Sequence, residues 1–86
     1  MAIFWKKEKE MKQYYKYITC KPFKKWLMGK ALNTDKRKLL TALQRTFHLE
    51  TTGIMDERTF VRLTRVKDKE VDAIKQLTKK NLAAIN

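Results

Sequence analysis

The stretch LLTALQRTFHLETTGIMDERTFVRL, which spans residues 39–63, decides the fold of this chain. In its first half, apolar side chains recur at three- and four-residue spacing, at Leu39, Leu40, Leu43 and Phe47. That spacing places them on one face of a helix, and a face of this kind is normally buried. The other face of the predicted helix carries polar residues, namely Lys36, Arg37, Lys38, Gln44 and Arg45.

Residues that favour helix termini mark the two ends of this helix. Thr34 or Asp35 can cap the N-terminus, because a short side chain with an acceptor oxygen can bind the first free N–H groups. We expect the helix to end near His48, since the Glu-Thr-Thr-Gly that follows has poor helix propensity. Gly53 closes that sequence and can adopt the positive φ angle that turns the chain.

A second helix should begin at Asp56. Its carboxylate can accept the backbone N–H near Thr59, and Met55 and Phe60 have the spacing of a hydrophobic staple. The chain therefore predicts two helices joined by a tight apolar turn, which together form a helix-turn-helix core over residues 35–67.

Several positions of this core fall at the spacing of a known family. They are Leu43-Gln44, Leu49, Thr52-Gly53, Asp56, Thr59 and Leu63. Through these positions, residues 39–63 resemble the second half of the type 1 peptidoglycan-binding domain. The resemblance implies a similar helix-turn-helix core. As a function it implies a cell-wall module in which the turn from Leu49 to Asp56 borders a groove for peptidoglycan.

The whole chain has the size and composition of one small all-α domain. It has 86 residues, of which 43% are hydrophobic, and it contains two glycines and one proline. A chain of this length buries a modest core, and strand-like alternation is absent. We expect a bundle of three to five helices in a single domain, residues 1–86. Its parts are Lys- and aromatic-rich N-terminal helices over 1–33, the helix-turn-helix core over 34–67 and a C-terminal amphipathic helix over 68–86.

Two helices are predicted in the N-terminal third. The first covers residues 3–18, where one face carries Phe4, Met11, Tyr15 and Ile18. The second begins after Pro22, which suits a first helical position, and continues through Leu32.

Net charge is the second strong signal, because 21 basic and 9 acidic residues give +12. Residues 1–33 carry nine Lys and two Glu, a net +7, whereas residues 56–86 carry eight basic and five acidic groups, a net +3. A small protein with this charge should bind polyanions. Most of the basic residues are Lys, which contacts phosphates as a point charge and reads bases poorly. We therefore expect low sequence selectivity in any binding of DNA or RNA.

Aromatic residues are interleaved with these lysines, a composition that favours nucleic-acid binding. The predicted phosphate contacts are Lys6, Lys7, Lys24, Lys25, Lys30, Lys36, Arg37, Lys38, Arg58, Arg62 and Arg65. The predicted stacking residues are Trp5, Tyr14, Tyr17 and Trp26. The alternative is that the aromatic rings form the core of a small domain. In that case we expect Tyr14, Tyr17 and one tryptophan to stay exposed.

The C-terminal part allows two further readings. Arg58, Arg62 and Arg65 recur on one helix face and could form a basic ridge for a DNA groove, although a solvated face is the alternative. Apolar residues beyond Asp56 keep helical spacing as far as Ile85, with a break near Lys67-Asp68, so this part is one long helix or two. Its last apolar residues could pack in the core or form a homodimer seam.

Enzymatic chemistry is poorly supported by the sequence. His48 lies at a predicted helix C-terminus, where a capping or dipole role is favoured. Cys20 has no partner of obvious function, and Asp56 and Glu57 are explained as capping residues. Because no phosphate loop, catalytic triad or metal-ligand spacing is present, we expect no enzyme activity, no cofactor and no metal.

The single Cys20 and the absence of an 18-residue apolar run favour cytoplasmic residence without a transmembrane segment. The start MAIFW is too short for the apolar region of a signal peptide. A basic helix with Trp and Phe could alternatively lie on an anionic membrane.

Three functions therefore remain as hypotheses. The first is a non-enzymatic nucleic-acid-binding or nucleoprotein accessory protein. The second is the peptidoglycan-binding module that the resemblance implies. The third is a small modulator, of the kind phages and mobile elements encode, that binds an acidic host protein.

Overall fold

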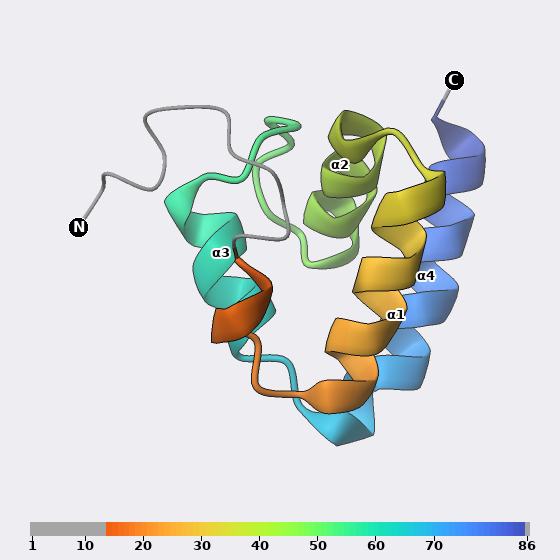
Figure 1. Cartoon of the computed structure of the whole chain (residues 1–86). Coiled ribbons are helices and arrows are strands. Elements are labelled where there is room, and N and C mark those ends of the chain that lie inside the picture. The colour runs from red at the N-terminus through yellow and green to blue at the C-terminus, as the bar shows by residue number, and fades with distance from the viewer. Residues whose placement is uncertain (1–13, 86) are drawn as a thin grey trace.

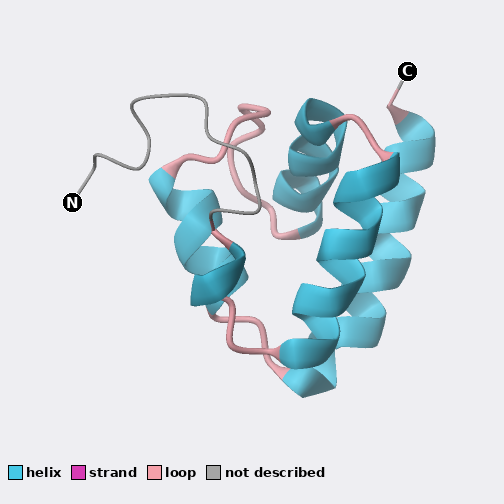
Figure 2. Ribbon diagram, in the orientation of Figure 1, coloured by secondary structure: helices cyan, strands magenta, loops and turns pink. Residues whose placement is uncertain are grey.

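The computed structural model describes residues 14–85, and this range contains four α-helices (Figure 1). They are α1 (Lys21–Asn33), α2 (Lys36–Thr46), α3 (Glu57–Thr64) and α4 (Val71–Ala84). Two short 3-10 turns, η3 (Tyr15–Tyr17) and η4 (Asp68–Glu70), precede α1 and α4. Over the described range Figure 2 shows helices and loops but no strand. The predicted all-α fold is confirmed.

α2 is buried on most of its circumference, because other elements pack on several of its sides. Leu39, Ala42 and Leu43 have no exposed surface, and neither has Gln44. α4 packs along α2. The prediction that Gln44 lies on a polar face was wrong, because the loop between α2 and α3 folds back over α2 and hydrogen-bonds to the Gln44 amide.

Both ends of α2 have clear local causes. Asp35 is the N-cap, and its carboxylate accepts the N–H groups of Arg37 and Lys38. At the other end, His48 has a positive φ of 60°. Its N–H donates to the carbonyl of Arg45, and the N–H of Leu49 donates to the carbonyl of Gln44. This pair of bonds is the Schellman motif, which ends a helix and turns the chain away from its axis.

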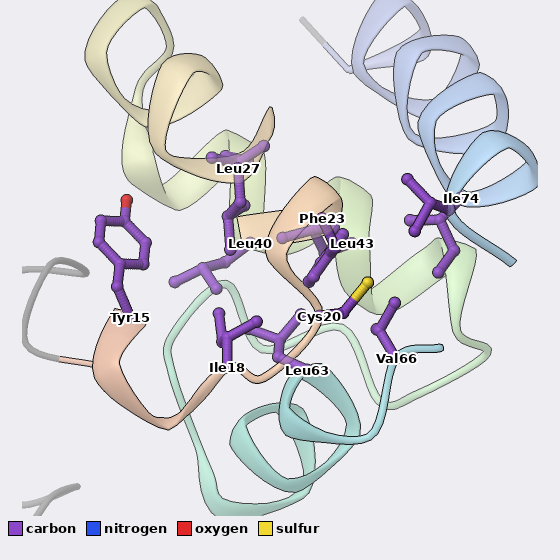
Figure 3. Packing of buried hydrophobic residues seen from close by; sticks show 12 residues of the cluster. Tyr15, Ile18, Cys20, Phe23, Leu27, Leu40, Leu43, Leu63, Val66 and Ile74 are labelled. Atoms are coloured by element: carbon purple, nitrogen blue, oxygen red, sulfur yellow. The ribbon is translucent and has the colours of Figure 1, made fainter. Parts of the chain in front are cut away.

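The core lies where α1, α2, α3 and the start of α4 converge (Figure 3). Phe23 and Leu27 of α1 are completely buried, and they meet the apolar face predicted for α2. The remaining members of the cluster are Tyr15, Ile18, Cys20, Leu39, Leu40, Leu43, Leu63, Val66, Val71 and Ile74. The apolar spacing of residues 39–63 therefore specifies the centre of the core.

The N-terminal part differs from its prediction where it is described. Tyr15–Tyr17 form the 3-10 turn η3, and Ile18 is extended, so the helix predicted over 3–18 does not continue to Ile18. Ile18 and Thr19 are both β-branched, which favours extended backbone, and Ile18 is buried in the core. The rest of that predicted helix, with Phe4 and Met11, lies outside the described residues.

The remaining helix predictions are settled by α1, α3 and α4. α1 begins at Lys21, one residue before Pro22 and not after it as predicted, and Pro22 occupies its first turn. The break near Lys67-Asp68 separates α3 from α4, so the C-terminal part is two helices. Val71 and Ile74 are buried in the monomer, whereas Leu77 is 46% exposed. Among the described helices, none has the length and apolarity that a membrane crossing requires.

Candidate nucleic-acid interface

Net positive charge is concentrated in the first half of the described chain, because acidic residues are scarce there. Residues 14–49 contain nine basic residues and one acidic residue, a net +8, whereas residues 50–85 contain eight basic and six acidic residues, a net +2. The first half corresponds to η3, α1 and α2. The strongly positive segment therefore extends beyond residue 33, as the predicted contacts Lys36, Arg37 and Lys38 imply, and it includes all of α2.

α1 is a helix whose charged residues are all lysines. Pro22 fits its first turn because that position needs no backbone N–H. Phe23 and Leu27 fix the inward face of α1. Lys21 and Lys25 are exposed and Lys24 and Lys30 are half-buried, and in the described structure none of the four has an ion-pair partner.

The first turn of α2 adds three cations, Lys36, Arg37 and Lys38, and all three side chains are exposed. Asp35, the single acidic residue of 14–49, caps this turn, with its Oδ1 2.8 Å from the N of Arg37 and 3.3 Å from the N of Lys38. Its carboxylate is therefore committed to the backbone, and it forms no salt bridge with these side chains.

Arg37 is also held by the loop that follows α2. Gly53 has a φ of +75°, and a Cβ at this position would lie 3.2 Å from Arg37 Cγ and 3.3 Å from Thr41 Oγ1. Gly53 thus allows the loop backbone to approach α2 closely. The aliphatic part of Arg37 is packed against this turn, which restricts where its guanidinium can lie.

The predicted ridge on α3 is divided by its middle member. Arg62 Nη2 lies 3.1 Å from Glu70 Oε1, and the Arg62 guanidinium lies 4.5 Å from the centre of the Phe47 ring. Arg62 therefore joins α3 to η4 and to the end of α2. Arg58 on α3 and Arg65, the residue that caps its C-terminus, are exposed and have no such partner in the described structure.

The predicted stacking residues do not form one surface. Tyr14 is 3% exposed, so its prediction as an exposed ring was wrong; its ring packs edge-on against Phe60, with centroids 5.6 Å apart. Tyr17 is 37% exposed. Trp26 is half-buried against the core. Trp5, like Lys6 and Lys7, lies outside the described residues.

The loop between α2 and α3 is held by a buried hydrogen-bond network centred on Gln44. Its Nε2 donates to Thr52 Oγ1, Thr59 Oγ1 and the carbonyl of Ile54, at 2.8 to 2.9 Å. Its Oε1 accepts the N–H of Gly53 at 2.9 Å. Most positions of the local resemblance meet here, and they are occupied by contacts within the protein.

Asp56 extends this network at the start of α3. It accepts the N–H and the hydroxyl of Thr59 through Oδ1 and the hydroxyl of Thr52 through Oδ2. Burial acts to raise the pKa of Asp56, but these hydrogen bonds outweigh it and hold the pKa below its ordinary value. The charged carboxylate is thus a capping and bridging group, as its position in the sequence predicts.

Cys20 and His48 have structural surroundings. Cys20 is buried, and its Sγ donates a hydrogen bond to Asp68 Oδ1 at 3.0 Å. Burial raises the pKa of the Cys20 thiol, and the bond to Asp68 acts in the same direction, so the thiol is held protonated near neutral pH. His48 acts through its backbone in the Schellman motif.

Three exposed cations of the positive segment were absent from the predicted site. They are Lys16, Lys21 and Arg45. The signal that identifies them is the scarcity of acidic residues from 14 to 49, a segment that contains all three.

Groups of His, Cys, Asp and Glu that could hold a metal ion are absent from the described part of the chain. No protein-family model, no curated protein and no solved structure matches this chain.

Proposed function

We propose that this protein is a small, non-enzymatic nucleic-acid-binding protein, and that α1 and the first turn of α2 form its binding surface. The observation that carries the proposal is the net +8 of residues 14–49, whose basic side chains are exposed or half-exposed. The ion pair in the described structure, Arg62–Glu70, lies outside this segment. The cations of residues 14–49 are therefore available to phosphates. Contact between these cations and phosphates would release counterions from the nucleic acid.

The placement of these cations supports the proposal, because it does not serve helix stability. The N-terminus of a helix carries a partial positive charge, so basic residues there are unfavourable by about 0.3–1 kcal/mol each at low salt. The first turns of α1 and α2 nevertheless contain no acidic residue, and Lys36, Arg37 and Lys38 occupy the first turn of α2. Residues that weaken the fold locally are often retained for binding.

The same residues argue against base-specific recognition. The proposed surface presents lysines on α1 and a single arginine, Arg37, on the first turn of α2, where the turn at Gly53 restricts it. A lysine contacts phosphate as a mobile point charge. Bidentate reading of guanine is mainly a property of arginine. We therefore expect binding that depends weakly on sequence.

The test is fluorescence anisotropy of labelled oligonucleotides over a salt series. The variant is Lys25→Gln/Lys36→Gln/Lys38→Gln, and the matched control is Lys69→Gln/Lys79→Gln/Lys80→Gln, which removes the same charge from exposed positions of 50–85. If the three cations contact phosphates, affinity should fall by about 500-fold at ~0.1 M salt and the log–log salt slope should become shallower by about 2.7. The control should change both quantities much less.

If the two variants lost affinity equally, net charge alone would explain binding, and the proposed surface on α1 and α2 would be wrong. Binding that is independent of salt would overturn it. A stoichiometric complex with one acidic protein from nuclease-treated lysate, lost in the first variant only, would replace nucleic acid by a protein partner.

Peptidoglycan binding is the second candidate, and the local resemblance of residues 39–63 favours it. The exposed side chains of this turn are those of Glu50, Thr51 and Ile54, and Ile54 is 49% exposed. Sedimentation with purified sacculi stripped of anionic polymers tests this candidate. Retention that is lost on Ile54→Ser and kept in the triple Lys→Gln variant would support it, whereas retention only by walls that carry anionic polymers would indicate attraction by charge.

A further inference from the structure

We infer that the binding surface selects double-stranded nucleic acid, which it contacts through phosphates without stacking on bases. This inference rests on the proposed function and names the form of the ligand. It follows from the positions of the aromatic rings, because a protein that prefers single strands stacks exposed rings on unpaired bases.

The rings nearest to the start of the positive segment are packed on one another. Tyr14 and Tyr17 both contact the ring of Phe60 edge-on, with centroids 5.6 and 5.3 Å apart. Tyr17 keeps 37% of its surface exposed, but Lys16 Nζ lies 5.2 Å from the centre of its ring. A base that stacked on Tyr17 would have to displace that ammonium group.

The other aromatic rings of the described chain are also engaged. Phe23 is fully buried, and the Trp26 ring lies against it with centroids 5.9 Å apart. Arg62 lies over the ring of Phe47. Tyr15 is 8% exposed and belongs to the core. The rings therefore stabilise the fold between residues 14 and 85, and each has a packing partner there.

The surface of α1 and α2 carries positive charge on regular helices and no exposed aromatic ring, although the apolar side chains of Met28 and Leu32 on α1 are exposed as well. A surface of this kind binds in proportion to the density of phosphates, and a duplex carries more charge per length than a single strand. For about four phosphate contacts in ~0.1 M salt, slopes of about −0.9 per contact for duplex and −0.7 for single strands predict roughly sixfold tighter binding to duplex.

The experiment compares one 20-nucleotide DNA sequence of mixed composition as a labelled single strand and as a labelled duplex, by anisotropy at several salt concentrations. The full chain is compared with a Trp5→Leu/Tyr17→Leu variant, whose folding is verified by circular dichroism. The double variant removes the one exposed ring of the described chain and the stacking candidate outside it. We expect duplex to bind roughly sixfold tighter, with a steeper salt slope, and the double variant to bind both forms within about twofold of the parent chain.

Tighter binding of the single strand would overturn the inference, and so would a loss of single-strand affinity above tenfold in the double variant. Either result would leave the proposed function intact, since the protein would still bind nucleic acid. If neither form binds, the proposed function fails and the inference fails with it.

Discussion

The Gln44 amide donates a 2.8 Å hydrogen bond to the hydroxyl of Thr59, and this buried contact joins α2 to the first turn of α3. The hydroxyl of Thr59 in turn donates to Asp56 at 2.6 Å. The chain of donors runs in one direction, from amide to hydroxyl to carboxylate, which fixes the orientation of the Gln44 side chain. The core of this small domain therefore includes a polar network that holds its central loop.

Gln44→Leu should destabilise the protein by about 2–4 kcal/mol, because it leaves the buried N–H of Gly53 without its acceptor and removes the amide donor shared by Thr52, Thr59 and the carbonyl of Ile54. Urea unfolding measures the change. Gln76→Leu is the matched control, since Gln76 is exposed on α4, and it should change stability by less than ~0.5 kcal/mol. Similar small effects in both variants would mean that the loop is not held by the network.

The two glycines should respond to alanine in opposite directions. Gly53→Ala should destabilise by more than ~1 kcal/mol, because its φ is +75° and the new Cβ would lie 3.2 Å from Arg37 Cγ. Gly29 lies inside α1 with no atom within 4 Å of the new Cβ, so Gly29→Ala should stabilise by about 0.5–1 kcal/mol. Thermal unfolding of the two variants compares them. Stabilisation by both would contradict the close approach of loop and helix.

Asp56→Asn should reveal a dependence on pH. The pKa of Asp56 in the folded protein lies below its ordinary value of 3.8, so the charged form stabilises the fold above that pH, and this contribution is lost as pH falls through the folded pKa. The variant should be less stable by about 1 kcal/mol at pH 7, and the difference should shrink below pH ~4.

Urea unfolding at pH 7 and at low pH measures this difference. Asp72→Asn is the control, because Asp72 is exposed on α4 and has no hydrogen-bond partner in the described structure. A difference between Asp56→Asn and the parent chain that stays constant with pH would assign the loss to the shape of the cap and not to its charge.

His48→Gly should stabilise the protein by about 1 kcal/mol. His48 has a φ of 60° at the C-terminus of α2, a conformation that costs a non-glycine residue roughly 1–2 kcal/mol. His48→Ala is the control, because it removes the imidazole and keeps the cost of the backbone conformation. Calorimetry should show a higher Tm for the glycine variant only. Destabilisation by both variants would indicate a role for the imidazole.

The sequence was sufficient where a local pattern alone determines structure. The apolar spacing from Leu39 to Leu63, the cap at Asp56 and the turn at Gly53 all act within a few residues, and all are present in the structure. It was insufficient where distant segments decide burial. Gln44 has the spacing of a solvated residue, and only the return of the loop over α2 buries it.

The aromatic residues of the candidate site show the same limit. Tyr14 and Tyr17 both pack edge-on against Phe60 of α3, yet Tyr14 is 3% exposed and Tyr17 is 37% exposed. Composition suggested base stacking because it cannot distinguish a ring in the core from a ring at the surface. The surface position of charged residues was more predictable, since the predicted contacts Lys25, Lys36 and Lys38 are exposed.

Lys38→Glu should strengthen the fold and weaken nucleic-acid binding in the same molecule. Lys38 is the third residue of α2 after its N-cap Asp35, and a glutamate at this position completes a capping box and complements the helix dipole. We expect a gain of about 0.5–1 kcal/mol in the free energy of unfolding and a loss of affinity for duplex of at least tenfold at ~0.1 M salt.

Lys79→Glu is the control for Lys38→Glu, because it makes the same charge change on an exposed position in the C-terminal half of α4, where the dipole offers no gain. Urea unfolding and anisotropy on the same preparations separate the two effects. If Lys38→Glu destabilised the protein, Lys38 would have a structural role that explains its position. If it stabilised the protein and left affinity unchanged, the basic first turn of α2 would not belong to the binding surface.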